Sequence, residues 1–427
     1  MTAPIPFSDP SWLMGLPSAH FTDSHRKWQQ TIRPFIQKHL IDRAVEWEKL
    51  ETVPAEVFGE FAKANMLLPA LPAPLPVDWL KRLGIHQLPG GLKVEDFDYL
   101  HSLIYSDEMA RSGLAGPPGS LTTGNLILTV YQVPPIIKFG NKQLQERFLP
   151  DLLTGKKRSC IAITEPDAGS DVANITTTAV KSSCGKFYIV NGTKKWITNG
   201  VWTNWASMAV RTGGPGPGGL SMLVVPLKGE PGVTMRRLKV GGQIAAGTSF
   251  IELDDVKVPV ENLIGKEGMG MKYVMTNFNH ERLSIAVGVT RAARVALSTA
   301  FEYVMKREAF GKPLSNESQW AWVEQFAFQM TRMTKEDADR ELGGMTGLLK
   351  AQAGIVLKEC ANTAVLLFGG NGYTRSGQGE VIEMLYREVP GARIPGGSED
   401  VLLDLAVRQL VKLYQAKTKA LAAEAKL

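Results

Sequence analysis

Apolar residues recur at the spacing of an amphipathic helix in four segments of the first third of the chain, residues 23–39, 54–66, 94–111 and 121–138. Pro54 lies at the start of the second segment, where a helix does not need the N–H that proline lacks. The stretch over residues 68–91 is rich in proline and breaks the helical pattern. We therefore expect helices in the first third, interrupted by a long ordered loop over 68–91.

The pattern changes to short β-rich runs between about residues 160 and 260. The runs FYIVNG, WASMAVRT, SMLVVPL and SFIELDDVKV are separated by Gly, Asn and Pro. They predict an antiparallel β unit, either a sandwich or a barrel. The glycine-rich stretch 213–219 lies between two of these strands. No helix follows it and no Lys-Ser/Thr closes a phosphate-binding motif, so we expect a hairpin loop there.

Helical spacing returns at about residue 268 and continues toward the C-terminus. One long helix is predicted from 268 to 307, a second over 349–367 before Gly369–Gly370, and a third over 401–417. Long neighbouring helices of this kind form antiparallel bundles. The chain is therefore predicted to be an α+β protein, with an N-terminal helical domain (1–158), a central β domain (159–264) and a C-terminal helical bundle (265–427).

Composition and charge exclude several classes of protein. Of the 427 residues, 44% are hydrophobic and 21% are charged, which excludes a disordered or fibrous chain. The net charge of +6 is small and the basic residues are dispersed, so we expect no nucleic-acid binding, although an anionic ligand is favoured over a cationic one. The sequence contains no apolar run of about 18 residues, so we expect no membrane-spanning helix. The three scattered cysteines predict no zinc site, and we expect no metal.

The two ends of the chain bear on its localisation. The N-terminus has no basic region followed by an apolar core, so neither a secretory signal nor a mitochondrial presequence is evident. The C-terminal Ala425-Lys426-Leu427 is close to the S-K-L peroxisomal address. We expect a peroxisomal protein, and otherwise a cytoplasmic one. The preceding residues have a similar composition, which leaves coincidence as the alternative.

Two segments of the β region interrupt the regular pattern with polar residues. In CIAITEPDAGSD (160–171), a strand runs into a turn carrying the hydroxyls of Thr164 and Ser170, which can hold a planar, hydrogen-bonding ring. In KKWITNG (194–200), Trp196 and Thr198 alternate along a strand and should share one face. An indole beside a hydroxyl can pack on and orient an aromatic cofactor. On periodicity alone, ordinary β-core is the alternative for both.

Two further segments lie in the helical C-terminal third. In HERLSIAVG (280–288), Glu281 shares a partly apolar helix face, where its carboxylate would be disfavoured and could act as a tuned base. A solvated charge or an ion pair is the alternative. In RIPGGSEDV (393–401), Pro395 to Gly397 predict a tight turn before a helix whose start can bind an anionic group. The alternative there is a simple capped turn.

Taken together, the motifs ITEPDAGSD, KKWITNG, REAFGKPL, FGGNGY and the terminal GGSE resemble the acyl-CoA dehydrogenase family in order and approximate spacing. The resemblance covers most of the chain. It implies an N-terminal helical domain, a central β-barrel and a C-terminal four-helix bundle. It also implies FAD as the cofactor, an acyl-CoA substrate and a homo-oligomer, expected as a tetramer built from two dimers.

The resemblance assigns a role to each matching residue. The residues expected to contact FAD are Ile163, Thr164, Gly169, Ser170, Trp196, Ile197, Thr198, Arg307, Phe310, Gln319, Gly369, Gly370, Ser398 and Glu399. The first seven would surround the flavin ring, and the next three would hold the diphosphate and adenine across a subunit interface. The two glycines would approach that FAD from the partner subunit, and the last two would close over it. The residues expected at the substrate are Ser170, Asn279, Arg282 and Gly396.

The resemblance also bears on the catalytic base. Most members of the family carry a glutamate immediately before the glycine of the terminal turn, a position expected here at Pro395. Isovaleryl- and long-chain-type members instead carry it on the long C-terminal helix, where Glu281 matches. Glu281 is therefore expected to take the α-proton of the thioester while the β-hydrogen leaves as hydride to the flavin. Because proline has no N–H, one donor to the enolate oxygen would be lost, unless the N–H of Gly396 replaces it.

Some functional alternatives stay open on the sequence. The electron acceptor is expected to be either an electron-transfer flavoprotein or oxygen. A flavoprotein oxidase or monooxygenase of the same fold, acting on a substrate other than a thioester, is the main alternative function. A non-catalytic flavoprotein that contacts DNA would need a concentrated basic patch, which the dispersed Lys and Arg do not predict.

Overall fold

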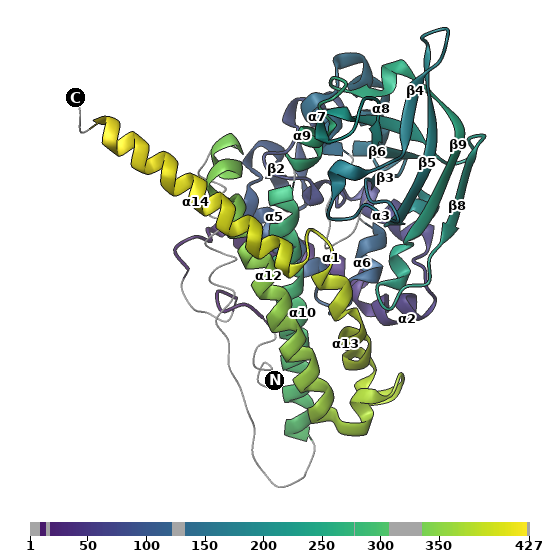
Figure 1. Ribbon diagram of the computed structural model, residues 1–427. Coiled ribbons are helices and arrows are strands. Elements are labelled where there is room, and N and C mark those ends of the chain that lie inside the picture. The colour runs from purple at the N-terminus through teal and green to yellow at the C-terminus, as the bar shows by residue number, and fades with distance from the viewer. Residues whose placement is uncertain (1–8, 14–17, 122–132, 277, 307–334, 425–427) are drawn as a thin grey trace.

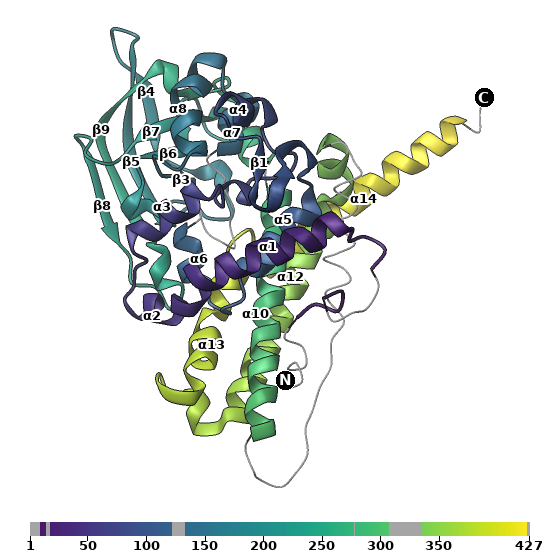
Figure 2. The ribbon, with the colours of Figure 1, turned by 180° about the vertical axis from the view of Figure 1, so that it is seen from behind.

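The β domain lies at one side of the computed structural model, next to helices from both ends of the chain (Figure 1). The structure describes residues 9–13, 18–121, 133–276, 278–306 and 335–424. Seen from behind, the N-terminal helices lie against the C-terminal helices and beside the sheet (Figure 2). The predicted α, β, α order and α+β class are confirmed. Residues 307–334, which carry three of the expected FAD contacts, and the terminal residues 425–427 lie outside the described residues.

The N-terminal helices are α1 (Asp23–His39), α2 (Ala44–Lys49), α3 (Ala55–Lys63), α4 (Val77–Arg82), α5 (Tyr99–Met109), α6 (Gly116–Leu121), α7 (Val133–Phe139) and α8 (Lys142–Leu153). The helix predicted over 94–111 starts later, because the Asp98 side chain accepts hydrogen bonds from the N–H groups of Leu100 and His101 and caps α5. The expected loop over 68–91 was only partly right, because it contains α4 and the short strand β1 (Gln87–Leu88), which pairs with β2 (Leu92–Lys93).

The β domain is built on one sheet of eight strands, β3 (Ser159–Ala162), β4 (Thr178–Lys181), β5 (Phe187–Ile197), β6 (Trp205–Arg211), β7 (Leu220–Pro226), β8 (Val233–Arg237), β9 (Ser249–Pro259) and β10 (Leu263–Ile264). Its order is β10-β7-β6-β4-β5-β9-β8, with β3 also paired to β6. Most pairs are antiparallel as predicted, but β3 and β4 both pair with β6 in parallel. Stretch 213–219 connects β6 to β7, as expected for a hairpin loop.

The C-terminal helices are α9 (Gly270–Met275), α10 (Phe278–Lys306), α12 (Lys335–Phe368), α13 (Glu380–Arg393) and α14 (Glu399–Glu424). The single helix predicted from residue 268 is therefore two helices. At the end of α9, the Thr276 hydroxyl donates to the carbonyl of Lys272 and competes with helix continuation. Helix α12 packs against α10, α13 and α14, and α14 extends away from the body (Figure 1).

One described helix, Glu341–Tyr373, is long and apolar enough to cross a membrane by length and composition. The core helix of a bundle passes the same test, and this segment packs between the other C-terminal helices. The observation is therefore weak evidence for a membrane span.

A buried ion pair fixes α10 against the N-terminal helices. The Arg291 guanidinium on α10 binds the Asp107 carboxylate on α5, with Nε donating to Oδ1 at 2.8 Å, and both side chains are almost completely buried. Buried pairs of this kind give little net stability, but removing one partner strands the other charge at a cost of about 3–5 kcal/mol. The pair therefore holds the long helix in one position relative to the N-terminal domain.

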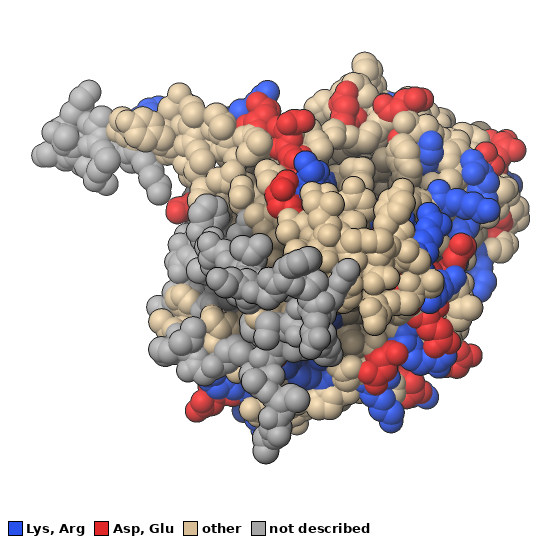
Figure 3. Space-filling view, turned by 90° about the horizontal axis from the view of Figure 1, so that it is seen from below, with Lys and Arg blue, Asp and Glu red and all other residues tan. Residues whose placement is uncertain are grey.

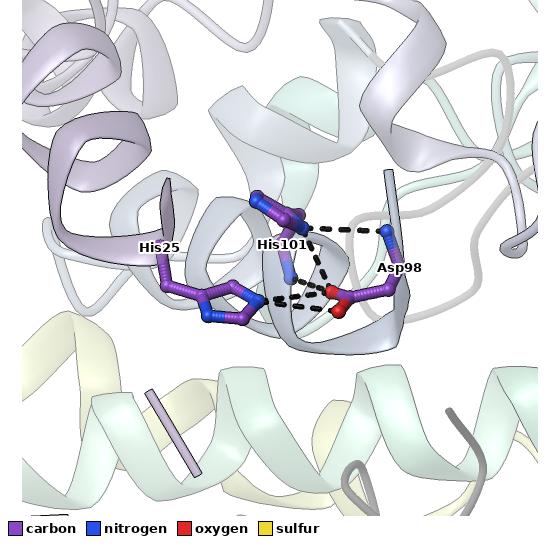
Figure 4. A group of neighbouring side chains, drawn as sticks. All are labelled: His25, Asp98 and His101. Carbon is purple, nitrogen blue, oxygen red and sulfur yellow. Dashed lines mark hydrogen bonds and ion pairs between the residues drawn. The ribbon is translucent and has the colours of Figure 1, made fainter. Parts of the chain in front are cut away.

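The starts of α1 and α5 are joined by two histidines that share one carboxylate (Figure 4). Asp98 accepts from His25 Nε2 at 3.2 Å and from His101 Nδ1 at 2.8 Å. The Thr22 N–H donates to His25 Nδ1 at 2.9 Å, and the Ser24 hydroxyl lies 3.1 Å from His101 Nε2. His25, Asp98 and His101 offer ligand-type atoms within 4.8 Å of one another. Because every ring nitrogen already has a protein partner, we interpret the group as a link between two helix starts.

We expect Asp98→Ala to destabilise the protein by about 2–4 kcal/mol, because it removes a helix cap and the acceptor of two buried histidines. Burial raises the pKa of Asp98, but the hydrogen bonds from His101 and His25 outweigh it and lower the pKa overall. Stability from this carboxylate is therefore present above its unfolded pKa of about 3.9 and is lost below it. Urea unfolding of the wild type and of Asp98→Asn should converge as the pH falls below about 4. A constant difference would contradict this assignment.

Candidate active site

Helix α10 places Glu281 inside the protein near the start of the C-terminal bundle. The side chain is 4% exposed, and its Oε2 has no hydrogen-bond partner among the described residues. Burial raises the pKa of Glu281 to about 8, although the charges of Arg282 and Lys350 oppose this rise. Ile285 and Gly288 follow at helical spacing and share the face of Glu281. Burial therefore moves the pKa of this carboxyl toward neutral pH, and a general base works best when its pKa lies near the working pH.

The turn between α13 and α14 closes against Glu281. Gly396 and Gly397 have φ values of +69° and +105°, a region that favours glycine. A Cβ on Gly396 would lie 3.7 Å from both Cδ and Oε1 of Glu281. The turn is fixed on the same side by Arg282, whose Nε donates to the Gly396 carbonyl at 3.3 Å. Two segments far apart in sequence thus converge on one carboxyl group.

This geometry bears on the position that the sequence analysis gave to Pro395. A Cβ on Gly396 would meet Ile285 Cδ1 first, at 2.6 Å, with the Glu281 carboxyl 3.7 Å away. Gly396 is therefore a residue of the closing turn that lies beside the candidate base. Because Gly396 has a backbone N–H, the geometry favours the alternative in which that donor is retained.

Two basic residues tie this turn to the helices around it. The Lys350 ammonium on α12 donates to the carbonyls of Arg393, at 2.6 Å, and Gly397, at 2.9 Å. Arg393 binds the Glu399 carboxylate in a bidentate pair, with Nη2 donating to Oε2 at 2.6 Å. Ser398 and Glu399, which the sequence analysis placed at FAD, thus belong to the start of α14, and Glu399 is held by an ion pair.

The expected flavin segments meet at the end of β5. Lys195 N–H donates to the Thr164 carbonyl at 3.0 Å, which brings the strand–turn segment beside Trp196. Trp196 is 49% exposed and has a φ of +59° within a bulge of β5. Thr198 lies beyond the end of the strand, so the predicted alternation of Trp196 and Thr198 on one face was wrong. The bulge turns the indole outward, while Ile197 points into the core.

A buried lysine holds the first flavin segment in place. Lys194 Nζ donates to the Glu165 carboxylate at 2.8 Å, to the Ile163 carbonyl at 3.0 Å and to the Ala209 carbonyl at 2.7 Å. Glu165 also accepts from the Thr177 N–H at 3.0 Å. Burial lowers the pKa of Lys194 to about 8, and the Glu165 charge opposes this. The Lys194–Glu165 pair was not predicted from the sequence. The one sequence feature that could have indicated it is a lysine in the middle of a strand pattern.

The expected site residues fall into separate groups in one chain. Glu281, Arg282 and Gly396 are brought together, and Asn279 Oδ1 lies 3.5 Å from Arg282 Nη1. Exposed Gly169 and Ser170 belong to the flavin segments. Gly369 and Gly370 are exposed at the far end of α12, about 28 Å along the helix from Lys350 at 1.5 Å per residue. Arg307, Phe310 and Gln319 lie outside the described residues.

Comparison with known proteins identifies the class to which this fold and site belong. Three domain models of acyl-CoA dehydrogenase match the chain, the N-terminal domain over residues 22–156, the middle domain over 160–256 and the C-terminal domain over 268–411. The acyl-CoA dehydrogenase apdG of Emericella nidulans is 65% identical, covering 98% of each chain. The acyl-CoA dehydrogenase AFT10-1 of Alternaria alternata is 33% identical, covering 95% of each.

Solved structures agree with this result. Acyl-CoA dehydrogenase from Geobacillus kaustophilus superposes with a TM-score of 0.76 at 29% identity, covering 92% of this chain and all of that one. Butyryl-CoA dehydrogenase from Megasphaera elsdenii gives 0.74 at 25% identity, with 92% and 100% coverage. The chain belongs to the acyl-CoA dehydrogenase family, and it is an FAD-dependent oxidoreductase.

The flavin segments fit FAD on their own geometry. Trp196 presents a half-exposed indole from a left-handed backbone conformation that is unfavourable for a large side chain. Beside it, a Cβ on Gly169 would meet only Thr164 Cγ2, at 4.0 Å, so backbone can approach a ligand closely there. An apolar ring face with neighbouring hydroxyl and backbone groups suits a planar ring. FAD would be held by Thr164, Ser170 and Trp196, where it supplies a hydride acceptor.

Proposed function

We propose that this protein desaturates an acyl-CoA thioester between its α and β carbons, with Glu281 as the base that removes the α-proton. The observation that carries the proposal is the buried Glu281 carboxyl, which has one oxygen without a described partner and faces the Gly396 turn. A group that must accept a proton needs a free lone pair and a pKa near the working pH. Bound FAD would supply the acceptor for the β-hydrogen, which leaves as hydride.

The closing turn supplies the second element of this mechanism. Removing the α-proton puts negative charge on the thioester oxygen, which needs hydrogen-bond donors. Gly396, whose Cβ would lie 3.7 Å from the Glu281 carboxyl, carries such a donor, and its carbonyl accepts a hydrogen bond from Arg282. Gly396 has a backbone N–H, so it is the candidate to replace the donor that Pro395 lacks.

Anaerobic titration of the purified FAD-containing protein with acyl-CoA thioesters of graded chain length tests this function. We expect at least one thioester to bleach the flavin absorbance and to yield the 2-enoyl-CoA product. If none reduces the flavin, the main alternative of an oxidase or monooxygenase acting on a non-thioester substrate gains support. The titration also identifies the chain length that reduces the flavin fastest.

The pH dependence of flavin reduction should follow the ionisation of Glu281. Because burial raises its pKa to about 8, the base is mostly protonated below that pH and mostly ionised above it. We expect kcat/KM to fall about tenfold for each pH unit below 8 and to level off above it. Stopped-flow rates measured from pH 6 to 10 check this. A profile that is flat down to pH 6 would contradict a base with this environment.

We also propose that the protein is a homo-oligomer, expected to be a tetramer. Helix α14 extends from the body and exposes Val407, Val411 and Tyr414 at helical spacing, with exposed fractions of 62%, 48% and 73%. The α12–α13 end of the bundle, which faces the viewer in Figure 3, is largely uncharged. It exposes Leu366 and Tyr373 beside the Gly369–Gly370 turn, at 72% and 85%. Apolar surfaces of this extent on two elements favour contact with other subunits.

The electron acceptor and the compartment stay predictions. Either an electron-transfer flavoprotein or oxygen can reoxidise a flavin enzyme of this family. The peroxisomal address lies at residues 425–427, outside the described residues. On the face shown in Figure 3, Lys and Arg gather along one side with Asp and Glu among them, which gives the DNA-contact alternative no support.

A further inference from the structure

Lys350 is a buried cation with no described carboxylate within ion-pair distance. It lies on α12 with 1% of its surface exposed. Its two hydrogen bonds go to backbone carbonyls, those of Arg393 and Gly397. Among the described residues, none offers a carboxylate oxygen within 4.0 Å of its ammonium. Burying an ammonium costs free energy unless hydrogen bonds and nearby opposite charge offset the loss of water.

The two carbonyls that Lys350 binds stand on either side of the closing turn. Arg393 is the last residue of α13, where backbone carbonyls have no helical partner. Gly397 lies on the other side of the turn, and both Gly396 and Gly397 have positive φ values. One ammonium therefore caps α13 and draws both ends of the Ile394–Gly396 segment toward α12. A cation is also the favoured charge at a helix C-terminus.

The segment held in this way is the one that faces the base. Gly396 stands between the two bound carbonyls, and a Cβ there would lie 3.7 Å from the Glu281 carboxyl and 2.6 Å from Ile285 Cδ1. If Lys350 released either carbonyl, the position of the Gly396 N–H relative to Glu281 would no longer be fixed on this side. The Arg282 bond to the Gly396 carbonyl would be the remaining described tie from α10.

Charges reach Lys350 from each helix packed around it. Glu281 and Arg282 act from α10, Arg393 from α13 and Glu399 from α14. Burial lowers the pKa of Lys350 to about 8, against the opposing effect of Glu281 and Glu399. Glu399 is itself paired with Arg393, so Glu281 is the carboxylate in this group without an ion-pair partner. Lys350 and Arg282 both favour the ionised form of Glu281.

We propose that Lys350 is a positioning residue for the acyl-CoA reaction, which ties the carbonyls of Arg393 and Gly397 to α12, fixes Gly396 against Glu281 and favours the proton-accepting form of that carboxylate. The inference rests on the proposed role of Glu281. A purely structural role for Lys350 would change only the position of the turn. The proposed role also requires that Lys350 change the ionisation of Glu281.

Lys350→Met tests this, since it keeps the length of the side chain and removes the ammonium. We expect kcat to fall about tenfold or more, with KM changed less, because a displaced turn affects the reacting geometry. The acid limb of the kcat/KM profile should move to higher pH by about one unit, because a cation that favours the ionised carboxylate is gone. Lys358→Met, at an exposed position on the same helix, is the matched control and should leave both unchanged.

Lys350→Arg provides the second variant. It keeps the charge but replaces a compact ammonium with a planar fork, so we expect the wild-type pH limb with a reduced kcat. Lys350→Met with wild-type kcat and pH profile would overturn the proposal. If Lys350→Met does not retain FAD, Lys350→Arg decides, and a wild-type kcat or a displaced limb in that variant would overturn it. Glu281→Gln separates the two ideas, since activity retained there removes the base role itself.

Discussion

We expect Glu281→Gln to slow acyl-CoA-dependent flavin bleaching about 10³-fold while FAD stays bound. A general base of this kind contributes about 10²- to 10⁴-fold, and glutamine has nearly the same shape but cannot accept the proton. The fold should be retained, because a neutral amide is easier to bury than a carboxyl that must ionise. Anaerobic stopped-flow reduction with the best thioester from the titration measures the rate.

The control for this variant is Glu252→Gln, which changes an exposed carboxylate on β9. It should bleach at the wild-type rate. The visible spectrum and the FAD content of Glu281→Gln should match those of the wild type, which separates lost proton transfer from lost cofactor. Bleaching within tenfold of the wild-type rate would remove Glu281 from the base role.

The second large effect is expected when a carboxylate is moved from α10 to the closing turn. We expect the double variant Glu281→Ala, Gly396→Glu to reduce the flavin at least tenfold faster than Glu281→Ala alone. The Cβ of residue 396 lies 3.7 Å from the Glu281 carboxyl, so the new side chain starts beside the space that Glu281 vacates. Ile285 Cδ1, 2.6 Å from that Cβ, must move, and the left-handed backbone costs about 1–2 kcal/mol. Rates should therefore stay below those of the wild type.

Pro395→Glu in the same Glu281→Ala background is the matched comparison. Residue 395 is the position that the sequence analysis assigned to the turn-borne base. In the structure, a Cβ on the neighbouring Gly396 would lie 3.7 Å from the Glu281 carboxyl. If flavin bleaching recovered in the Pro395→Glu variant and not in the Gly396→Glu variant, residue 395 would be the position of a turn-borne base. The enolate oxygen would then lack a backbone N–H donor, because proline has none.

The broad architecture and the family were predictable, because several motifs in one order carry more information than any one of them. Glu281 was found through the resemblance, after periodicity had placed it on a partly apolar face. The closing turn was harder, because the motif aligns Pro395 with the turn-borne acid but does not show how far each turn residue lies from Glu281. The 3.7 Å between a Cβ on Gly396 and the Glu281 carboxyl is a property of the three-dimensional structure.

Buried lysines were the least predictable parts of the site. Lys350 lies in a helix and Lys194 in a strand, and charged residues in such patterns are usually solvent-exposed. Each is buried because distant segments supply carbonyl acceptors, at Arg393 and Gly397 for one and at Ile163 and Ala209 for the other. The orientation of Trp196 was also wrongly predicted, because a bulge in β5 breaks the alternation of side chains that the strand pattern predicts.

Carrying the base on α10 has a consequence for redesign. The proposed base, Glu281, stands on a helix held by the Arg291–Asp107 pair, and the adjacent Gly396 contributes only backbone. Exposed side chains of the closing turn, such as Ile394, could therefore be exchanged without moving the carboxyl that we propose to react. Enzymes of this type with the acid on the turn itself would have to alter selectivity and chemistry together.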